Sequence, residues 1–188
     1  MNLMINTGTL RSNSQVISAS TAADVLSYAV ADCELGKVLV ARSAKGVCSI
    51  LLGDNAEELT ADLADRFPQS TLIASEAVVK DDLAKVLRYI AKPSDGLRLT
   101  LHMRGTPFQR RVWEKLKVIS AGRTVSYMEL AKWISPLANP RVVAGACAAN
   151  PIALAIPCHR VVRTNGDLAG YRWGIERKRE LIRKEAMA

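Results

Sequence analysis

The sequence predicts a two-part protein, with an α/β N-terminal domain over residues 23–103 and a mainly α-helical domain over residues 104–188. Short apolar runs separated by turn residues predict a small β-sheet with helices in the first part. Helix-start signals and helical spacing of apolar residues dominate the second part. The charge changes at the same boundary, because residues 1–103 carry 10 Lys and Arg against 12 Asp and Glu, whereas residues 104–188 carry 16 against 6. A basic second half favours a polyanionic partner such as nucleic acid, although a basic surface kept for solubility would look the same.

Length and composition are those of an ordinary globular protein. The 188 residues are 49% hydrophobic and 23% charged, enough to bury the core of one large domain or two small ones. No apolar run reaches membrane-spanning length, and the N-terminus lacks the basic and apolar regions of a secretion signal. We therefore expect a soluble, cytoplasmic protein without a membrane partner. Residues 1–22 are rich in Ser, Thr and Asn and are expected to be a mobile leader.

The four cysteines are Cys33, Cys48, Cys147 and Cys158, and the chain has only two histidines. No Cys-x-x-Cys pair is present, so we expect no structural zinc site and no other metal. A disulfide framework is not expected in a chain of this size without a secretion signal. Most of the thiols are therefore expected to be small buried side chains, and the question is whether one of them is reactive.

The N-terminal elements follow from the alternation of apolar and turn residues. A β-meander is expected, with turns at residues 34–36 and 44–46. Pro68 stops the helix that comes next, and apolar residues at helical spacing from Val79 to Ile90 predict a second helix. No catalytic constellation occurs here, so this half is expected to support the other one. The expected ranges are strands over residues 26–33, 37–43 and 46–53, helices over 55–67 and 76–90, and a last strand over 97–103.

Two helix starts are well marked in the second half. Thr106 is expected to cap a helix that has Pro107 as its first residue. Ser126 and Glu129 form a Ser-x-x-Glu capping box, which predicts a further helix over residues 127–134.

A last short helix, expected over residues 140–149, follows a turn at 135–140 and completes a predicted helix-turn-helix, although any helical hairpin shares this pattern. Proline inside a helix removes a backbone donor and clashes with the preceding turn, so Pro140 is expected at the first helical position with Asn139 as N-cap. Beyond Arg141 the helix carries almost only small residues. It can therefore approach DNA closely without reading base edges, unless the small residues serve only packing against the core.

The stretch Ile-Pro-Cys-His-Arg-Val-Val at residues 156–162 carries the clearest chemical signal. A positioned base lowers the pKa of a thiol and makes it a nucleophile, so Cys158 beside His159 suggests a thiolate–imidazole pair. Neighbours in an extended chain point to opposite faces, so a turn or a bridging water is needed to couple them. A Cys-His dipeptide by itself is more often accidental than catalytic.

Longer motifs carry a family resemblance. The stretches ADCELGKVLV, GTPFQRRVW, TVSYMELA, GACAANPIALAIPCHRVV and GYRWGIERKRELIRKEA are similar to those of the O6-alkylguanine-DNA alkyltransferases. Residues 28–186 resemble the alkyltransferase part of the bacterial adaptive-response (Ada) proteins. The resemblance implies a ribonuclease-H-like N-terminal domain and a winged-helix-like C-terminal domain. It also implies direct-reversal repair of O6-alkylguanine, and of O4-alkylthymine, by base flipping in double-stranded DNA and irreversible single-turnover transfer to a cysteine. No cofactor is implied, and the protein is expected to act as a monomer.

The resemblance places the acceptor thiol on Cys158, its partner on His159, which acts through a water, and the glutamate that orients this histidine on Glu185. The residue pattern agrees, because Glu185 shares a helix face with Leu181 and Ile182, and an inward carboxylate is costly unless it is paired. An exposed charge at a helix end is the alternative. The implied resting state is a thiolate stabilised by an imidazolium.

The remaining implied residues contact DNA or the base. Asn150 matches a hinge asparagine that ties the recognition helix to the active-site loop, beside a helix-capping role. Arg141 matches the arginine that fills the gap left by the flipped base. Tyr127 matches the tyrosine that rotates the nucleotide phosphate and donates to the guanine N3, with core packing as the alternative. Further implied contacts are Arg160, Ala146 and Ala149 with DNA, and Pro157, Val161, Tyr171 and Arg172 around the substrate.

Two other functions stay open at this point. A non-enzymatic DNA binder would do no chemistry at Cys158, but the lesion sensors that resemble this family lack a cysteine in the motif. A cysteine hydrolase would turn over repeatedly and ignore DNA, but no separate oxyanion motif is found.

Ada proteins also carry an upstream zinc-binding regulatory region, and the 27 residues that precede the resemblance hold no cysteine. We therefore expect repair without transcriptional activation, unless the chain is a fragment of a longer protein.

Overall fold

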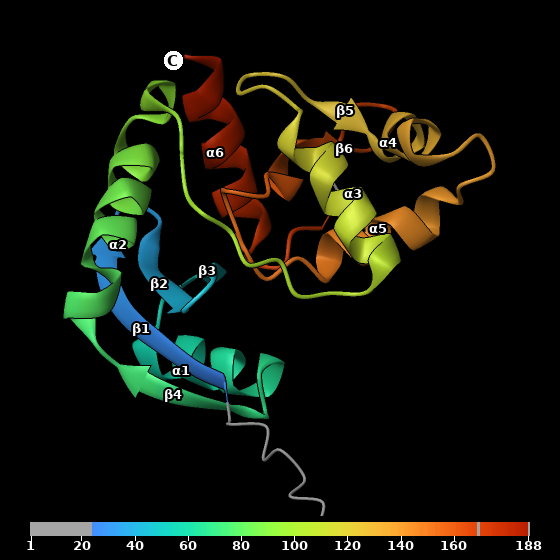
Figure 1. Cartoon of the computed structure of the whole chain (residues 1–188). Coiled ribbons are helices and arrows are strands. Elements are labelled where there is room, and N and C mark those ends of the chain that lie inside the picture. The colour runs from blue at the N-terminus through green and yellow to red at the C-terminus, as the bar shows by residue number, and fades with distance from the viewer. Residues whose placement is uncertain (1–23, 169, 188) are drawn as a thin grey trace, which may run out of the picture.

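The computed structural model describes residues 24–168 and 170–187 of the chain, and the predicted leader at residues 1–22 lies outside them. A small sheet with two helices forms the N-terminal half, and four further α-helices follow in the C-terminal half (Figure 1). Six α-helices and a mixed four-stranded sheet therefore make up the regular structure of the described residues, apart from two short 3-10 turns and a two-stranded pair. The predicted combination of an α/β part and a mainly helical part is confirmed at this level.

The sheet has the strand order β3-β2-β1-β4. Strands β1 (Asp24–Cys33), β2 (Gly36–Ser43) and β3 (Gly46–Gly53) form the predicted antiparallel meander. Strand β4 (Ser70–Ala74) pairs in parallel with β1 and was not predicted. It has only five residues, most of them exposed or half-buried, so its sequence lacks the continuous apolar run of a buried strand.

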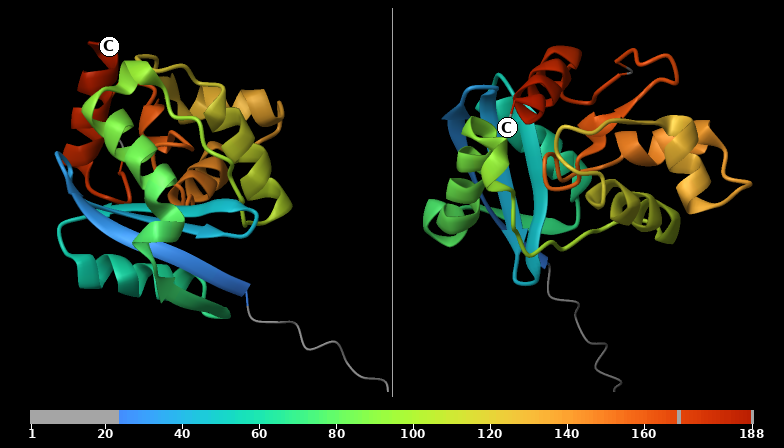
Figure 2. Two further views of the ribbon diagram at one scale, coloured as in Figure 1. Left: turned by 60° about the vertical axis from the view of Figure 1, so that its left-hand side comes forward. Right: turned by 90° about the horizontal axis from the view of Figure 1, so that it is seen from above.

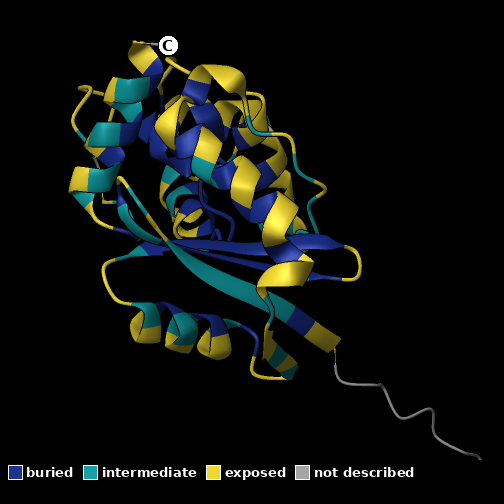
Figure 3. Cartoon of the chain, turned by 90° about the vertical axis from the view of Figure 1, so that its left-hand side faces the viewer, coloured by how far each residue is buried: buried dark blue, intermediate teal, exposed yellow. Residues whose placement is uncertain are grey.

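The two N-terminal helices cover opposite faces of the sheet. Helix α1 (Ala56–Arg66) packs on β2 and β3, and helix α2 (Glu76–Ala91) packs on β1 and β2 from the other side (Figure 2). Asn55 caps α1 by accepting hydrogen bonds from two backbone N–H groups of the first turn. The C-terminal half lies on the same face of the sheet as α2, so this face is the one that can position an active site (Figure 3).

The strand predicted over residues 97–103 is wrong. This segment follows a 3-10 turn (Pro93–Asp95) and makes only one isolated bridge, between Leu101 and Val47 of β3. The bridge is held by the Val47 N–H, which donates to Thr100 O at 2.8 Å, and by the His102 N–H, which donates to Val47 O at 2.7 Å. The outer edge of β3 bonds a different segment further along, so the pairing cannot extend into a full strand.

Local signals in the C-terminal half are confirmed. Thr106 and Ser126 both form complete capping boxes, at the starts of α3 (Pro107–Lys117) and α4 (Tyr127–Ile134). Helix α5 (Pro140–Ala148) starts at the proline as predicted, because the Asn139 side chain accepts from the Arg141 N–H at 2.9 Å. The remaining elements are the parallel pair β5 (Val125–Ser126) and β6 (Val161–Val162), a 3-10 turn at Cys158–Arg160, and α6 (Ile175–Ala186).

One continuous cluster of buried apolar side chains runs through both halves. Leu39 and Ile50 of the sheet, and Trp113 and Leu116 of α3, belong to it and are almost fully buried. Residues on both sides of the predicted domain boundary, between residues 103 and 104, thus share one core, and the boundary stays a prediction. Among the described residues, no helix combines the length and apolar character needed to cross a lipid bilayer.

Two glycines offer a matched test of the contact between β3 and the connecting segment. Gly46 has φ 132°, and a Cβ there would lie 2.4 Å from Thr100 O, whereas Gly96 has φ 70° and no atom within 4 Å of such a Cβ. We expect Gly96→Ala to lower the free energy of unfolding by about 1–3 kcal/mol, since φ 70° and ψ 165° suit glycine, and Gly46→Ala to lower it by at least about 2 kcal/mol more, because only the second adds a backbone clash to the conformational strain. Denaturant unfolding measures both, and equal losses would contradict the proposed close approach.

Candidate active site

The loop that carries Cys158 is fixed to the outer edge of β3. The Ile50 N–H donates to Pro151 O at 2.9 Å, and the Ala153 N–H donates back to Ile50 O at 2.9 Å. The Ser49 hydroxyl adds a third bond to Pro151 O at 3.1 Å. Strand β3 of the N-terminal sheet therefore holds the loop that follows α5 in position. This contact is one way in which the N-terminal half can support the site, as expected from the sequence.

Asn150 joins the end of α5 to the thiol. Its side chain is fully buried, and its Oδ1 accepts from the Ile152 N–H at 2.9 Å. Its Nδ2 donates to Ile156 O at 2.8 Å and to Cys158 Sγ at 3.3 Å. One amide thus holds the loop closed and places a hydrogen-bond donor on the sulfur.

Cys158 begins a 3-10 turn and is 6% exposed. Burial raises the pKa of its thiol to about 11, although the hydrogen bond from Asn150 and the charge of Lys178 both act to lower it. The thiol is therefore protonated near neutral pH. The buried Lys178, which sequence reasoning missed, donates to Val161 O at 2.6 Å.

His159 is fully buried, and its Nε2 lies 2.7 Å from Glu185 Oε1. Burial lowers the pKa of the imidazole, and the hydrogen bond and charge of Glu185 only partly oppose this. His159 Nδ1 is buried and has no hydrogen-bond partner among the described residues, so it makes no bond to Cys158. Desolvation disfavours the charge on both groups and favours a neutral thiol and a neutral imidazole in the free protein, whereas the implied thiolate–imidazolium pair, coupled through a water, stays a prediction.

Glu185 is the centre of a buried polar cluster. Besides His159, its carboxylate accepts from the Tyr89 hydroxyl at 2.7 Å, from the Arg160 guanidinium at 2.9 Å to each oxygen, and from the Gly122 N–H at 3.4 Å. Burial alone would raise the pKa of Glu185, but the hydrogen bonds from His159 and Arg160 outweigh it and hold this pKa well below its usual range. Glu185 is therefore ionised.

Arg160 does not face DNA, which corrects the role implied for it. Its side chain is buried, bound bidentately to Glu185, and also donates to Tyr89 Oη at 3.0 Å and to Ile119 O. Burial would lower the pKa of this guanidinium, but the Glu185 carboxylate raises it. An arginine held this way balances the glutamate and cannot reach a phosphate without breaking a buried ion pair.

A cavity of about 430 Å³ opens onto the sulfur of Cys158. Of the residues implied around the substrate, Tyr171 and Arg172 line this cavity, as does Tyr127, whereas the buried Val161 does not, and the contribution of helix α5 was missed. The α5 residues that line the cavity are Ala144, Cys147 and Ala148, which lie on one side of the helix. Their side chains are small, like most others in α5, so the sequence shows no contrast between an apolar and a polar face. The lining residues are Tyr127, Ala144, Cys147, Ala148, Cys158, Gly170, Tyr171 and Arg172.

Two tyrosines form walls of this cavity. The Tyr171 hydroxyl is buried without a hydrogen-bond partner in the described part of the chain, and its ring meets His159 edge-on at 6.4 Å. Burial raises the pKa of Tyr127 to about 12, so its phenol keeps its proton. Arg172 donates to Asp62 of α1 at 2.6 Å, which ties this wall to the N-terminal half. Pro157 is buried beneath the turn and does not line the cavity.

The outward face of α5 differs from the one expected. Arg141 and Val142 are exposed, as are Gly145 and Ala148 further along the helix. The DNA contact implied for Ala146 is wrong, because Ala146 is 4% exposed and its carbonyl accepts from Trp113 Nε1 at 2.8 Å. Ala149, also implied to contact DNA, is half-buried and lines a different cavity.

Comparisons with known proteins agree on one family. The family described as "6-O-methylguanine DNA methyltransferase, DNA binding domain" matches residues 107–187. The "Bifunctional transcriptional activator/DNA repair enzyme Ada" of Escherichia coli is 46% identical over 85% of this chain, but the match spans only 45% of Ada. The "Methylated-DNA--protein-cysteine methyltransferase" of Candida albicans is 36% identical over 86% of this chain and 97% of that protein. A solved structure of Mycobacterium tuberculosis OGT in complex with DNA has a TM-score of 0.68 and 30% identity, and covers 86% of this chain and 93% of that chain.

The neutral resting thiol can be tested by its pH profile. We expect modification of Cys158 by iodoacetamide to be slow at neutral pH and to rise about tenfold per pH unit between about pH 7 and pH 10, because only the thiolate reacts and its pKa is raised to about 11. Mass spectrometry of the Cys158 peptide measures this rate, with Cys158→Ser as the blank. A plateau that begins near pH 6 would instead indicate a thiolate–imidazolium pair.

The Glu185 cluster predicts a pH-dependent stability. Since its folded pKa lies below the unfolded value of 4.5, the unfolded chain binds the extra proton, and the stabilisation is full above this pH and lost as the pH falls below it. We expect Glu185→Gln to lower the free energy of unfolding by about 3–5 kcal/mol near neutral pH, because it leaves Arg160 unpaired, and this gap to narrow in acid. Denaturant unfolding at several pH values measures the gap. Glu176→Gln, on the exposed face of the same helix, is the control, and a gap independent of pH would contradict the assignment.

Proposed function

The chain belongs to the methylated-DNA–protein-cysteine methyltransferase family, and from this membership we propose that it repairs DNA by moving the alkyl group of O6-alkylguanine irreversibly onto Cys158. The observation that carries the proposal is that Cys158 lines a cavity of about 430 Å³ and is followed by a histidine held by a buried carboxylate. Whether O4-alkylthymine is also repaired depends on the same cavity, and we propose that it is.

The first step is removal of the thiol proton. Glu185 is ionised and can only accept, so the proton of a neutral His159 resides on Nε2 and Nδ1 carries a lone pair. In our proposal the proton of Cys158 passes to this Nδ1 through a water molecule as the alkylated base binds. Asn150 then donates to the sulfur and stabilises the thiolate that forms.

The second step is displacement at the alkyl carbon. The thiolate forms a C–S bond while the C–O6 bond breaks and its electron pair returns to the guanine. The base must gain a proton to leave well, and the Tyr127 hydroxyl at the cavity wall is our candidate donor. The proton held by His159 then passes to the Tyr127 phenolate, so both side chains return to their neutral states and the net exchange at the sulfur is alkyl for hydrogen. The product is a thioether that water does not cleave, which makes the protein a single-use reagent that needs no cofactor or metal.

The base reaches the sulfur only if it leaves the helical stack. Extrusion costs a few kcal/mol and costs least for a damaged pair, which helps to select the lesion. The exposed face of α5, with Gly145 and Ala148, would let the helix approach a duplex closely beside the cavity, and we propose that the exposed Arg141 at its start fills the gap. We propose double-stranded DNA as the partner of this face and a monomer as the acting unit.

The finer fold assignment belongs to the same proposal. The four-stranded mixed sheet with α1 and α2 on opposite faces supports a ribonuclease-H-like N-terminal domain. Helices α4 and α5 pack together around the turn at residues 135–139, which supports a helix-turn-helix of the winged-helix type.

The decisive measurement is the mass of the intact protein after incubation with a duplex that contains O6-methylguanine. We expect a stoichiometric gain of one methyl group, about 14 Da for CH2 replacing H, in the wild type and none in Cys158→Ala. Cys147→Ala is the matched control, since it removes the other thiol of the cavity and should still gain the mass. Tight binding of the lesion duplex without a mass change would indicate a lesion sensor. Repeated turnover of small esters or amides without DNA would indicate a hydrolase.

A further inference from the structure

The short parallel pair of β5 and β6 brings Arg163 next to Tyr127. Ser126, the last residue of β5, is paired with Val162, the last residue of β6. Tyr127 and Arg163 are the next residues along the two chains, and neighbouring strands lie about 5 Å apart. Helix α4, which Tyr127 begins, also packs on β6. The two residues are therefore neighbours at the end of this ladder.

A tight turn fixes the backbone at Arg163. Its N–H donates to Asp167 O at 2.9 Å, and its carbonyl accepts from the Gly166 N–H at 2.9 Å. The Asp167 carboxylate accepts from the Asn165 amide at 2.7 Å and not from the guanidinium. Arg163 is exposed, and no carboxylate within residues 24–168 and 170–187 forms an ion pair with it. Its charge is therefore available to a neighbouring group.

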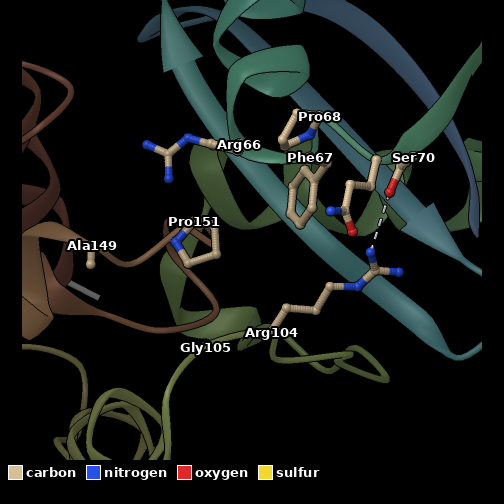
Figure 4. Close-up of a pocket in the computed structure, with 9 residues that line it drawn as sticks. Arg66, Phe67, Pro68, Ser70, Arg104, Gly105, Ala149 and Pro151 are labelled. Atoms are coloured by element: carbon tan, nitrogen blue, oxygen red, sulfur yellow. Dashed lines mark hydrogen bonds between the residues drawn. The ribbon is translucent and has the colours of Figure 1, made fainter.

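Three other arginines near the site have a carboxylate partner. Arg172, at the wall of the cavity that contains Cys158, donates to an aspartate of α1 at 2.6 Å. Figure 4 shows Arg66 and Arg104 at a different cavity, on either side of Phe67, and each of them also donates to an aspartate. These charges are balanced where they stand, unlike that of the arginine that follows β6.

The side chain of Tyr127 lines the same cavity as Cys158 and is the proton donor of the proposed reaction. Burial is the largest effect that raises the pKa of this phenol to about 12, and Cys147 and Cys158 raise it further, whereas the charge of Arg163 acts to lower it. Donation of the proton leaves a phenolate in the cavity. A desolvated anion of this kind is costly unless a cation lies near it.

We propose that Arg163 supports the transfer reaction through Tyr127, because its charge stabilises the phenolate that forms when the phenol gives its proton to the departing guanine. The inference rests on the proposed function and refines one of its steps. The O–H bond of the phenol breaks, its electron pair stays on the oxygen, and the negative charge persists until the proton held by His159 arrives. DNA lying over the cavity would exclude water and strengthen the attraction between this charge and the guanidinium.

A double-mutant cycle tests the coupling. Methyl uptake from a duplex that contains O6-methylguanine is followed over time by intact mass at saturating DNA, so a change in affinity does not alter the rate. We expect Arg163→Gln to slow transfer about tenfold, because the general acid becomes weaker, and Arg163→Lys to restore most of the rate, because it keeps the charge. On a Tyr127→Phe background we expect Arg163→Gln to cause no further loss, since no phenolate forms.

Arg123→Gln is the matched control. It removes the same charge from an exposed residue in the loop before β5, where the charge acts on Glu129, and it should transfer at the wild-type rate. If Arg163→Gln weakens DNA binding but leaves the rate at saturation unchanged, Arg163 is a phosphate contact only and the inference is overturned. Equal slowing with and without the Tyr127 hydroxyl would also overturn it, because the effect would not pass through the phenol.

The phenol can also be titrated without DNA. A difluorinated tyrosine in place of Tyr127 ionises at a lower pH than tyrosine does, and fluorine NMR follows its ionisation. We expect Arg163→Gln to raise the pKa of this phenol and Arg123→Gln to leave it unchanged, and an unchanged pKa in Arg163→Gln would overturn the inference. Failure of the wild type to take up a methyl group would overturn the proposed function, whereas the titration would still decide whether Arg163 acts on Tyr127.

Discussion

The buried carboxylate of Glu185 is the interaction on which the rest of the structure depends. It accepts hydrogen bonds from α2 through Tyr89, from the 3-10 turn through His159 and Arg160, and from the loop before β5 through Gly122. An ionised carboxylate in the core is stable only when cations and donors surround it. Burial lowers the pKa of His159, with a smaller contribution from the charge of Arg160, so the imidazole is neutral and the acceptor-only carboxylate fixes its proton on Nε2. One side chain therefore joins the two halves and sets the tautomer at the reactive site.

Apart from the Tyr89 hydroxyl on Glu185, the N-terminal half contributes to the site by positioning it. None of its described side chains lines the cavity at Cys158, but β3 carries the loop on Ile50 and Ser49, and Asp62 holds Arg172 at the cavity wall. These bonds are present before any ligand binds. The loop is therefore ordered during folding, and its ordering does not weaken ligand binding. The shared apolar core has the same consequence, because the helical half has no complete core without the sheet.

The sequence allowed prediction wherever the decisive interaction is local. The N-cap at Thr106, the capping box at Ser126 and the helix start at Pro140 depend on neighbours within three residues, and each was predicted. The Cys158–His159 pair was found because a short motif carries it.

What could not be predicted depends on distant partners or on small side chains. The Tyr89–Glu185 bond joins residues 96 positions apart, and nothing in the sequence around Arg160 shows that it turns inward toward the same carboxylate. Ala146 was placed on the wrong face because α5 has no apolar stripe to orient it. The segment at 97–103 alternates like a strand, but the edge it would need is already bonded to the loop at residue 152.

The neutral thiol fits a reagent that acts once. Because burial raises the pKa of Cys158 to about 11, the thiol is mostly protonated near neutral pH, and oxidants and other electrophiles meet little thiolate. A low-pKa thiolate would react faster with every electrophile, and each such reaction would consume a molecule of protein. Burial moves the ionisation to the moment when the base occupies the cavity, where Asn150 and the Nδ1 of His159 are already in place. On the proposed function, the desolvation that slows the free thiol is therefore also what restricts its reactivity to a bound lesion.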